Sequence, residues 1–486
     1  MVVKPDGRLT LDLDPHDRPP RDACGVFGVW APGEDVAKLA YYGLQVLQHR
    51  GQESAGIAVS DGRRIVVHKE MGLVAQVFDE PSLTALRGDI AVAHCRYSTT
   101  GAPVWANAQP TFRSSPAGSL ALGHNGNLTN TRELAAMLPA DSGLSMLQAT
   151  SDTDVLTELI IGSAAGSGNF AEAAVSVLPK VRGAYSLVFM DENTLYAARD
   201  PQGFRPLVLG ALGEGGWVVA SETAALDIVG ATFVREVEPG ELISADERGV
   251  RSRIFAPAAP KVCLFEYVYL ARPDTAIGGR GLHATRVEIG RRLAREYPAQ
   301  ADLVIPVPES GTPAAIGYAE ASGIPYGQGF VKNSYVGRTF IQPSQTIRQR
   351  GIRLKLNPLR DMIAGKRVVV VDDSIVRGNT QRAIVAMLRE SGALGVHVRI
   401  ASPPVKWPCF YGIDFSTRDE LIAGHLTVEE IRSSIGADSL GYVSLEGLVA
   451  ATEQPPTSLC RACFDGNYPV PVADHERGKD VLEPSY

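Results

Sequence analysis

Short apolar runs separated by turn residues dominate the first half of the chain. Between 183 and 245 they are GAYSLVFM, TLYAARD, GWVVAS and GELISA, with Gly, Asp and Asn at the breaks, and further apolar runs stand at 24–29 and 89–94. This pattern predicts β-strands joined by turns. A polar start and a Pro/Ala-rich finish at 245–260 predict a domain junction near 255.

In the second half, buried strands alternate with helical patterns. Four valines at 368–371 read as a strand buried on both faces, as in a parallel sheet covered by helices. The helical pattern TQRAIVAMLRE follows and ends near Gly392. A second buried strand lies in ADLVIPVPESG at 301–311, after a helical pattern at 286–297, and CLFEYVY at 263–269 predicts a further apolar strand. These elements predict an α/β domain.

Composition narrows the class of protein. A chain of 486 residues with 45% apolar and 21% charged residues should form two or more domains, and a net charge of -7 argues against broad nucleic-acid binding. No apolar run reaches the roughly 18 residues of a membrane helix, and residues 1–23 have no apolar core segment typical of a secretory signal. We therefore expect a soluble, cytoplasmic protein whose six cysteines are reduced thiols, metal ligands or catalysts.

An acidic pair, Asp372 and Asp373, follows the valine strand and precedes a polar turn that leads into a helix. Backbone N–H groups and the helix dipole favour an anion there, and two carboxylates can accept ribose hydroxyls or hold Mg²⁺. Alone, the pair could also be a strand end with a capping Asp. The sequence DDSIVRGNT resembles the phosphoribosyl diphosphate motif of type I phosphoribosyltransferases. This resemblance implies binding by Asp372, Asp373, Ser374, Val376, Arg377, Gly378, Asn379 and Thr380.

Two more stretches fit this resemblance. The PESG turn resembles the pyrophosphate loop of that family, which implies that Ser310 contacts Mg²⁺ or pyrophosphate. Residues 321–360 contain seven basic and no acidic side chains, a pattern of a solvated face or a nucleic-acid site. The part at 334–357 resembles the mobile loop that closes over the sugar diphosphate, and Lys355 is expected to bind that substrate. Asn379 stands where the family more often has Thr, and either side chain can hydrogen-bond a phosphate oxygen.

Cys24 opens the first apolar strand. A free cysteine is often a small core residue. However, RDACGVFGV and LQHRGQESAGI resemble the glutamine amidotransferases whose nucleophile is the N-terminal residue. The resemblance implies that residues 1–23 are a propeptide. Its removal would free the α-amine of Cys24 to act as the general base for its own thiol.

Three later stretches supply what an amide hydrolase needs. Arg96 can pair with a substrate carboxylate, Asn125 and Gly126 offer donors for an oxyanion, and Ser151 or Asp152 opens a helical pattern and could simply cap it. By resemblance, Arg96 holds the α-carboxylate of glutamine and Asp152 its α-ammonium. Asn125 with Gly126 then stabilises the tetrahedral oxyanion.

Four cysteines, two of them in a C-x-x-C pair, suggest a metal centre. These are Cys263, Cys409, Cys460 and Cys463. The spacing allows a zinc site with four thiolates, and structural thiols without metal are the alternative. The resemblance implies a 4Fe-4S cluster with no redox step in the reaction.

Taken together, the motifs resemble the amidophosphoribosyltransferases over residues 24–468. That family implies an α+β N-terminal-nucleophile (αββα) glutaminase domain at 24–255, an α/β type I phosphoribosyltransferase domain at 256–468 and a tail at 469–486. It implies that ammonia from glutamine displaces diphosphate from 5-phosphoribosyl 1-diphosphate, the first step of purine synthesis. A homotetramer inhibited by purine nucleotides is expected.

Two other classes compete. A sugar-phosphate aminotransferase would share the Cys24 domain but would carry isomerase-type domains in place of the 367–380 motif. A non-enzymatic regulator could use the second domain to sense phosphoribosyl diphosphate. Such a regulator would have no need for the complete set of Cys24, Arg96, Asn125 and Asp152.

Overall fold

The computed structural model describes residues 2–3, 9–10, 24–98, 100–138, 149–213, 215–333, 356–413 and 418–472. Most of the leader, most of the 334–357 loop with Lys355, and residues 473–486 lie outside the described residues. Along the described part of the chain, no helix combines the length and apolar character needed to cross a lipid bilayer.

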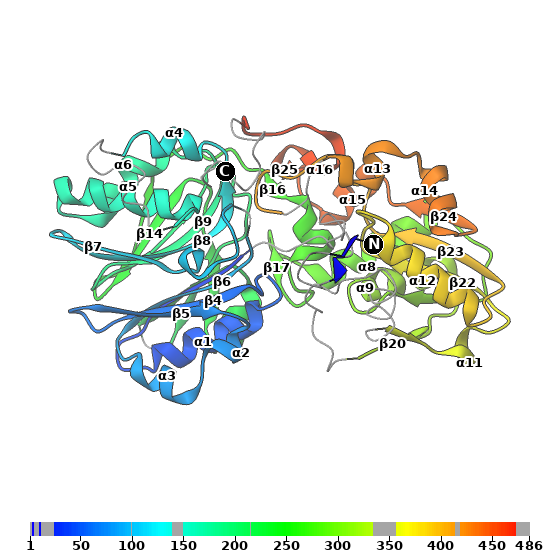
Figure 1. The fold of residues 1–486 in the computed structure, drawn as a ribbon, viewed down its shortest axis with the longest axis horizontal. Coiled ribbons are helices and arrows are strands. Elements are labelled where there is room, and N and C mark those ends of the chain that lie inside the picture. Colours follow the sequence, from blue (N-terminus) through cyan, green and yellow to red (C-terminus); the bar gives the residue numbers. More distant parts are fainter. Residues whose placement is uncertain are drawn as a thin grey trace.

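The first domain stacks two antiparallel sheets between two layers of helices (Figure 1). One sheet has the order β15-β14-β10-β9-β8-β7 and the other β13-β11-β12-β3-β6-β4-β5. The strands of the first sheet are β7 (Thr111–Ser115), β8 (Gly118–Leu128), β9 (Gly183–Met190), β10 (Leu195–Arg199), β14 (Glu241–Asp246) and β15 (Gly249–Ile254). Those of the second are β3 (Gly25–Trp30), β4 (Ser54–Ser60), β5 (Ile65–Met71), β6 (Ile90–Arg96), β11 (Val208–Leu212), β12 (Gly216–Ala220) and β13 (Thr232–Glu236).

Three apolar cores hold these layers together. Val26, Val92 and Val188 belong to the core between the sheets, while Phe27 and Ala93 face the opposite side of the second sheet. The alternation of side chains along a strand therefore feeds two cores at once. Helices α1 and α7 cover the second sheet, and α5 and α6 cover the first. The helices are α1 (Val36–Leu47), α2 (Val74–Val77), α3 (Glu80–Ala85), α4 (Thr131–Ala135), α5 (Asp152–Ser167), α6 (Phe170–Val177) and α7 (Thr223–Ile228).

The second domain contains a parallel sheet of order β19-β22-β23-β24, with β19 (Leu303–Pro306), β22 (Arg367–Asp372), β23 (Gly395–Ile400) and β24 (Ser439–Tyr442). Val369 and Val371 pack toward α8, α9 and α15, while Val368 and Val370 pack toward α12 and α14. All four valines are buried, as the sequence predicted. The helices are α8 (Leu282–Glu296), α9 (Thr312–Ser322), α11 (Arg360–Ile363), α12 (Asn379–Glu390), α13 (Ile422–His425), α14 (Val428–Ile435), α15 (Leu445–Thr452) and α16 (Ala462–Asp465).

Four short pairs of strands lie outside these three sheets among the described residues. They are β1 (Val2–Val3) with β2 (Leu9–Thr10), β16 (Val262–Cys263) with β25 (Leu459–Cys460), β17 (Ala276–Ile277) with β18 (Arg280–Gly281), and β20 (Phe330–Lys332) with β21 (Leu356–Pro358). The β16–β25 pair is parallel and ties the start of the second domain to residues near the end of the described chain.

The predicted strand at 263–269 is wrong beyond its first residue. Only Val262–Cys263 forms a strand, and Glu266–Leu270 forms a turn of π-helix. The reason is Glu266, a buried carboxylate that pairs with the guanidinium groups of Arg50 and Arg205. Arg286 also donates to the carbonyl oxygens of Glu266 and Tyr267. The Arg286 side chain thus provides hydrogen bonds to backbone carbonyl oxygens, which in a β-strand would have been bonded to a neighbouring strand.

Candidate active sites

Cys24 lies immediately before β3, in the middle of the seven-stranded sheet. Its thiol donates to the carbonyl oxygen of Tyr97 over 3.2 Å, and the Tyr97 N–H donates back to the sulfur over 3.3 Å. Burial raises the pKa of the Cys24 thiol to about 11, although the Tyr97 hydrogen bond and Arg96 act in the opposite direction. The thiol is therefore protonated near neutral pH and needs a base to become a nucleophile.

Four residues that the sequence predicts to act on the substrate glutamine line one small pocket: Cys24, Arg96, Gly126 and Asp152. A cavity of about 10 Å³ is lined by Cys24, Arg96, Tyr97, Thr100, Gln109, His124, Gly126, Asp152 and Thr153. This volume is about that of a single water molecule. Arg96 is buried at the end of β6, and its guanidinium donates to the carbonyl oxygens of Thr100 and Gly101 over 3.0 and 3.2 Å. Its donors thus hold the 100–102 segment across the pocket in this structure.

Asp152 is the first residue of α5, but Ser151 is the residue that caps the helix. The Ser151 hydroxyl accepts from the Asp154 N–H, whereas the Asp152 carboxylate accepts from the N–H groups of Leu128 and Thr153 over 3.0 and 2.8 Å. Of the two residues that the sequence offered as the N-cap of this helix, Ser151 is the one that caps it. The Asp152 carboxylate is buried and turned toward β8, where it can receive an ammonium group.

Asn125 and Gly126 lie side by side on β8. Among the described residues, neither side-chain atom of Asn125 has a hydrogen-bond partner, although the amide is buried. Such an unsatisfied amide is costly unless a ligand or water pairs with it. Gly126 has a φ of 150°, and a Cβ built there would lie 2.0 Å from the Ala184 carbonyl oxygen. Only glycine fits at this position, and the free amide next to it suits an oxyanion.

The second site lies at the carboxyl end of β22. Both Asp372 and Asp373 are buried. Burial and its neighbour Asp373 raise the pKa of Asp372 well above its usual value. Burial also raises the pKa of Asp373, while hydrogen bonds from Ser310 and Ser374 lower it. Two buried carboxylates side by side favour a cation or a hydroxyl-rich ligand.

The turn after this pair leads directly into α12. Gly378 has a φ of 82° and precedes the helix, whose first residues Asn379 and Thr380 are exposed. The α12 N-terminus thus presents N–H groups beside the acidic pair, as an anion site requires. Arg377 forms an ion pair with Glu420, and the Asn379 side-chain oxygen accepts from Arg382 over 3.0 Å. The remaining predicted members are Ser374, which donates to Asp373 over 2.6 Å, and Val376, which is buried in the core.

The four cysteines of the predicted metal centre are neighbours near the domain junction. Cys263 and Cys460 lie opposite each other in the register of β16 and β25. Burial raises the pKa of the Cys463 thiol well above its usual value, and the charges of the other three thiols raise it further. Within the described ranges, no three His, Cys, Asp or Glu side chains converge tightly enough to hold one metal ion. A zinc site needs that convergence. A 4Fe-4S cluster takes each thiolate on a separate iron, and the four thiols, three of them buried and that of Cys409 half-buried, suit such a group.

The structure also contains a buried charge network between the two domains, which the sequence analysis did not predict. Glu222 pairs with Arg50 in the first domain, and Glu266 of the second domain pairs with both Arg50 and Arg205. All four side chains are fully buried. The single signal in the sequence was the charged Glu266 inside the apolar run CLFEYVYL.

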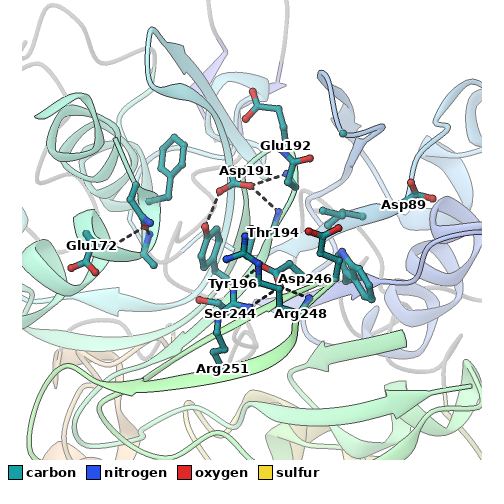
Figure 2. A pocket seen from close by; sticks show the side chains of 18 of the residues that line it. Asp89, Glu172, Asp191, Glu192, Thr194, Tyr196, Ser244, Asp246, Arg248 and Arg251 are labelled. Carbon is teal, nitrogen blue, oxygen red and sulfur yellow. Dashed lines mark hydrogen bonds and ion pairs between the residues drawn. The ribbon is translucent and has the colours of Figure 1, made fainter. Parts of the chain in front are cut away.

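A large cavity of about 940 Å³ lies elsewhere in the first domain and contains none of the predicted residues (Figure 2). Some of its charged side chains already bind one another: Asp246 accepts from Arg251 over 2.7 Å, and Glu172 accepts from Arg253 over 2.6 Å. Asp191 accepts from the Tyr196 hydroxyl over 2.7 Å. We therefore assign no chemistry to this cavity.

The Cys24 pocket on an αββα fold defines the first domain as a glutamine amidotransferase. Residues 94–227 match the family model described as a glutamine amidotransferase domain. The amidophosphoribosyltransferase of Mycobacterium tuberculosis is 65% identical over 475 residues, which cover 96% of this chain and 90% of that protein. The Bacillus subtilis amidophosphoribosyltransferase is 48% identical over 457 residues, which cover 93% and 95% of the two chains. The chain belongs to the amidophosphoribosyltransferase family.

Solved structures agree with this assignment. The glutamine phosphoribosylpyrophosphate amidotransferase of B. subtilis, complexed with ADP and GMP, superposes with a TM-score of 0.87 at 47% identity and covers 93% of this chain and 98% of its own. A structure described as the allosteric regulatory enzyme of purine biosynthesis has a TM-score of 0.89 at 47% identity, covering 95% and 99%. The family and the two-part fold class predicted from the sequence are confirmed.

Proposed function

We propose that this chain transfers ammonia from glutamine to C1 of 5-phosphoribosyl 1-diphosphate. The products are 5-phosphoribosylamine, glutamate and diphosphate, in the first committed step of purine biosynthesis. The observation that carries this proposal is that one chain contains both a buried thiol in a pocket lined by Arg96, Gly126 and Asp152 and a buried acidic pair at a helix N-terminus. Its full-length similarity to amidophosphoribosyltransferases supports the same reaction.

Glutamine hydrolysis is assigned to the Cys24 pocket. Removal of residues 1–23 would give Cys24 a free α-amine, which takes the proton from a thiol whose pKa burial holds at about 11. Arg96 would release the 100–102 carbonyls to bind the glutamine carboxylate, and Asp152 would bind the ammonium. The Asn125 amide and the Gly126 N–H would donate to the oxyanion of the tetrahedral intermediate.

The phosphoribosyl step is assigned to the carboxyl end of β22. Asp372, Asp373 and Ser310 would hold Mg²⁺, which supplies positive charge next to the leaving diphosphate. The 374–380 turn and the α12 N-terminus would bind phosphate, and Lys355, in the undescribed loop, would add a cation. Excluding water matters here, because a reactive sugar cation would otherwise be hydrolysed.

The thiols of Cys263, Cys409, Cys460 and Cys463 are proposed to hold a 4Fe-4S cluster with a structural role. Their location supports this, because the β16–β25 pair joins the first and last parts of the second domain. Stoichiometric zinc without iron and sulfide in anaerobically purified protein would contradict the cluster.

One solved relative supports a proposal on regulation. The B. subtilis structure contains ADP and GMP. We propose purine nucleotides as inhibitors of this chain and, from the family resemblance, a homotetramer as its assembly, in the cytoplasm, where cysteines stay out of disulfides.

One substitution tests the division of labour. Cys24→Ala should abolish glutamine-dependent synthesis while ammonia-dependent synthesis at high pH persists, because only the first step uses the thiol. Loss of both activities, or of neither, would contradict the role of Cys24. A protein that binds the sugar diphosphate but shows no ammonia-dependent synthesis would instead be a sensor. The N-terminal residue of the purified protein tests whether residues 1–23 are removed.

A further inference from the structure

One short segment of the second domain reaches the glutamine site. It is Phe410–Gly412, and it directly follows Cys409. The Asn127 side-chain amide donates to the Phe410 carbonyl oxygen over 3.1 Å. A Cβ built on Gly412 would lie 3.1 Å from both the Cα and the carbonyl carbon of Gly126. The segment therefore packs directly against the strand that carries the proposed oxyanion donors.

Arg205 of the first domain holds this segment in place. Its Nε and Nη2 donate to the Tyr411 carbonyl oxygen over 3.0 and 2.8 Å, and its Nη1 donates to the Glu266 carboxylate over 3.1 Å. The Tyr411 ring also stacks on Phe204 with ring centroids 4.3 Å apart. Because the guanidinium is fully buried and planar, it fixes the direction as well as the distance of these contacts.

The contact between Gly412 and Gly126 leaves no space for a side chain at position 412. Gly412 has a φ of 99°, and a Cβ there would also lie 3.2 Å from Arg205 Nη2. On its other side, Gly126 approaches the Ala184 carbonyl oxygen so closely that a Cβ would lie 2.0 Å from it. Gly126 is thus enclosed between one strand of its own sheet and one segment of the second domain, so a shift of the segment moves Gly126.

We propose that Phe410–Gly412 positions Gly126 and the adjacent Asn125 for glutamine hydrolysis, with Arg205 as a positioning residue. The inference rests on the oxyanion role proposed above for these two residues. The first domain then hydrolyses glutamine efficiently only when this segment of the second domain is docked. Donors to an oxyanion must be placed closely, and a misplacement of about 1 Å can cost about 100-fold in rate.

The test uses the full-length protein with Gly412→Ala and the matched control Gly436→Ala. Gly436 lies in the same domain with a φ of 76°, but the nearest atom to its Cβ is 3.8 Å away. We expect Gly412→Ala to lower kcat with glutamine about 10- to 100-fold, with a smaller change in KM. Ammonia-dependent synthesis and the rate of Cys24 alkylation by iodoacetamide should stay within about twofold of the control, because neither uses an oxyanion.

Asn127→Asp is a second variant that preserves the size of the side chain. It keeps the acceptor for the Thr100 hydroxyl, which lies 2.7 Å away, but it loses the donor to the Phe410 carbonyl oxygen, together with a longer contact of 3.3 Å to the carbonyl oxygen of the adjacent Leu128. We expect a loss of about 3- to 10-fold in kcat with glutamine, the size of one lost hydrogen bond. A glutamine kcat within twofold of the control for both variants would overturn the proposal, and so would an equal fall in the ammonia-dependent rate.

Asn125→Ala separates this inference from the one on which it rests. If Asn125→Ala lowers kcat with glutamine and Gly412→Ala does not, the oxyanion role stands and the positioning role fails. If Asn125→Ala leaves kcat unchanged, the oxyanion role fails first.

Discussion

Glu266 of the second domain and Arg50 of the first form a fully buried ion pair, with Oε2 and Nη2 2.8 Å apart. The same carboxylate accepts from Arg205, and Arg50 also pairs with Glu222. Removing one partner of a buried pair leaves a charge without compensation, which costs more than the pair itself contributes. The network therefore fixes the two domains to each other.

Glu266→Gln should lower the free energy of unfolding by about 3–5 kcal/mol, because two guanidinium groups lose a buried counter-charge. Chemical denaturation measures this loss. Glu429→Gln is the control, since its ion pair with Arg432 lies on the surface and its removal should change stability little. An equal, small effect of both substitutions would show that the domains do not depend on this network.

The reactivity of Cys24 should reveal whether its α-amine is free. In a chain that retains residues 1–23, alkylation by iodoacetamide should follow a pKa of about 11, because burial disfavours the thiolate. In a chain that starts at Cys24, the free amine provides a base of pKa about 8, so the rate should rise at lower pH. Cys24→Ala provides the background from the other cysteines. Identical pH profiles for the two chains would exclude the amine as the base.

His94 should make stability depend on pH. Burial lowers the pKa of His94 to about 3, although its hydrogen bond with the His124 carbonyl oxygen opposes this shift. The unfolded chain binds a proton near pH 6.5, and the folded chain does not until about pH 3. Stability is therefore lost as pH falls from about 6.5 toward 3. His94→Gln should flatten this slope in denaturation series at several pH values, and an unchanged slope would contradict the buried neutral state.

Replacing Asp372 and Asp373 together with Asn should abolish both glutamine- and ammonia-dependent synthesis, because both need the sugar diphosphate. Without Mg²⁺ the double variant should be at least as stable as the parent, since it removes two buried carboxyl groups whose ionisation burial and mutual repulsion disfavour. With Mg²⁺ and the sugar diphosphate, only the parent should gain thermal stability. Asp361→Asn, at an exposed position of α11, serves as control. Ligand-induced stabilisation of the double variant equal to that of the parent would refute the assigned site.

Much of the fold follows from local sequence patterns. The valines at 368–371 predicted a doubly buried strand because each face of that strand meets its own core. The strand predicted at 263–269 was wrong because the apolar run contains Glu266, which needs charged partners. One partner, Arg50, is 216 residues away in the sequence, and the other, Arg205, is 61 residues away. Periodicity describes neighbours along the chain, so it cannot report which charge will meet which.

The candidate sites show the same difference between local sequence patterns and contacts of distant residues. The sequence alone determined that the acidic pair stands between a buried strand and a helix N-terminus, because a strand, a turn and a helix hold those groups together locally. It also supplied Cys24, Arg96, Asn125 and Asp152 as separate candidates. Only the tertiary structure decided that Ser151 caps α5, which frees the Asp152 carboxylate for the pocket, and that Gly412 packs against Gly126. Those relationships depend on packing between distant segments, and no local pattern specifies them.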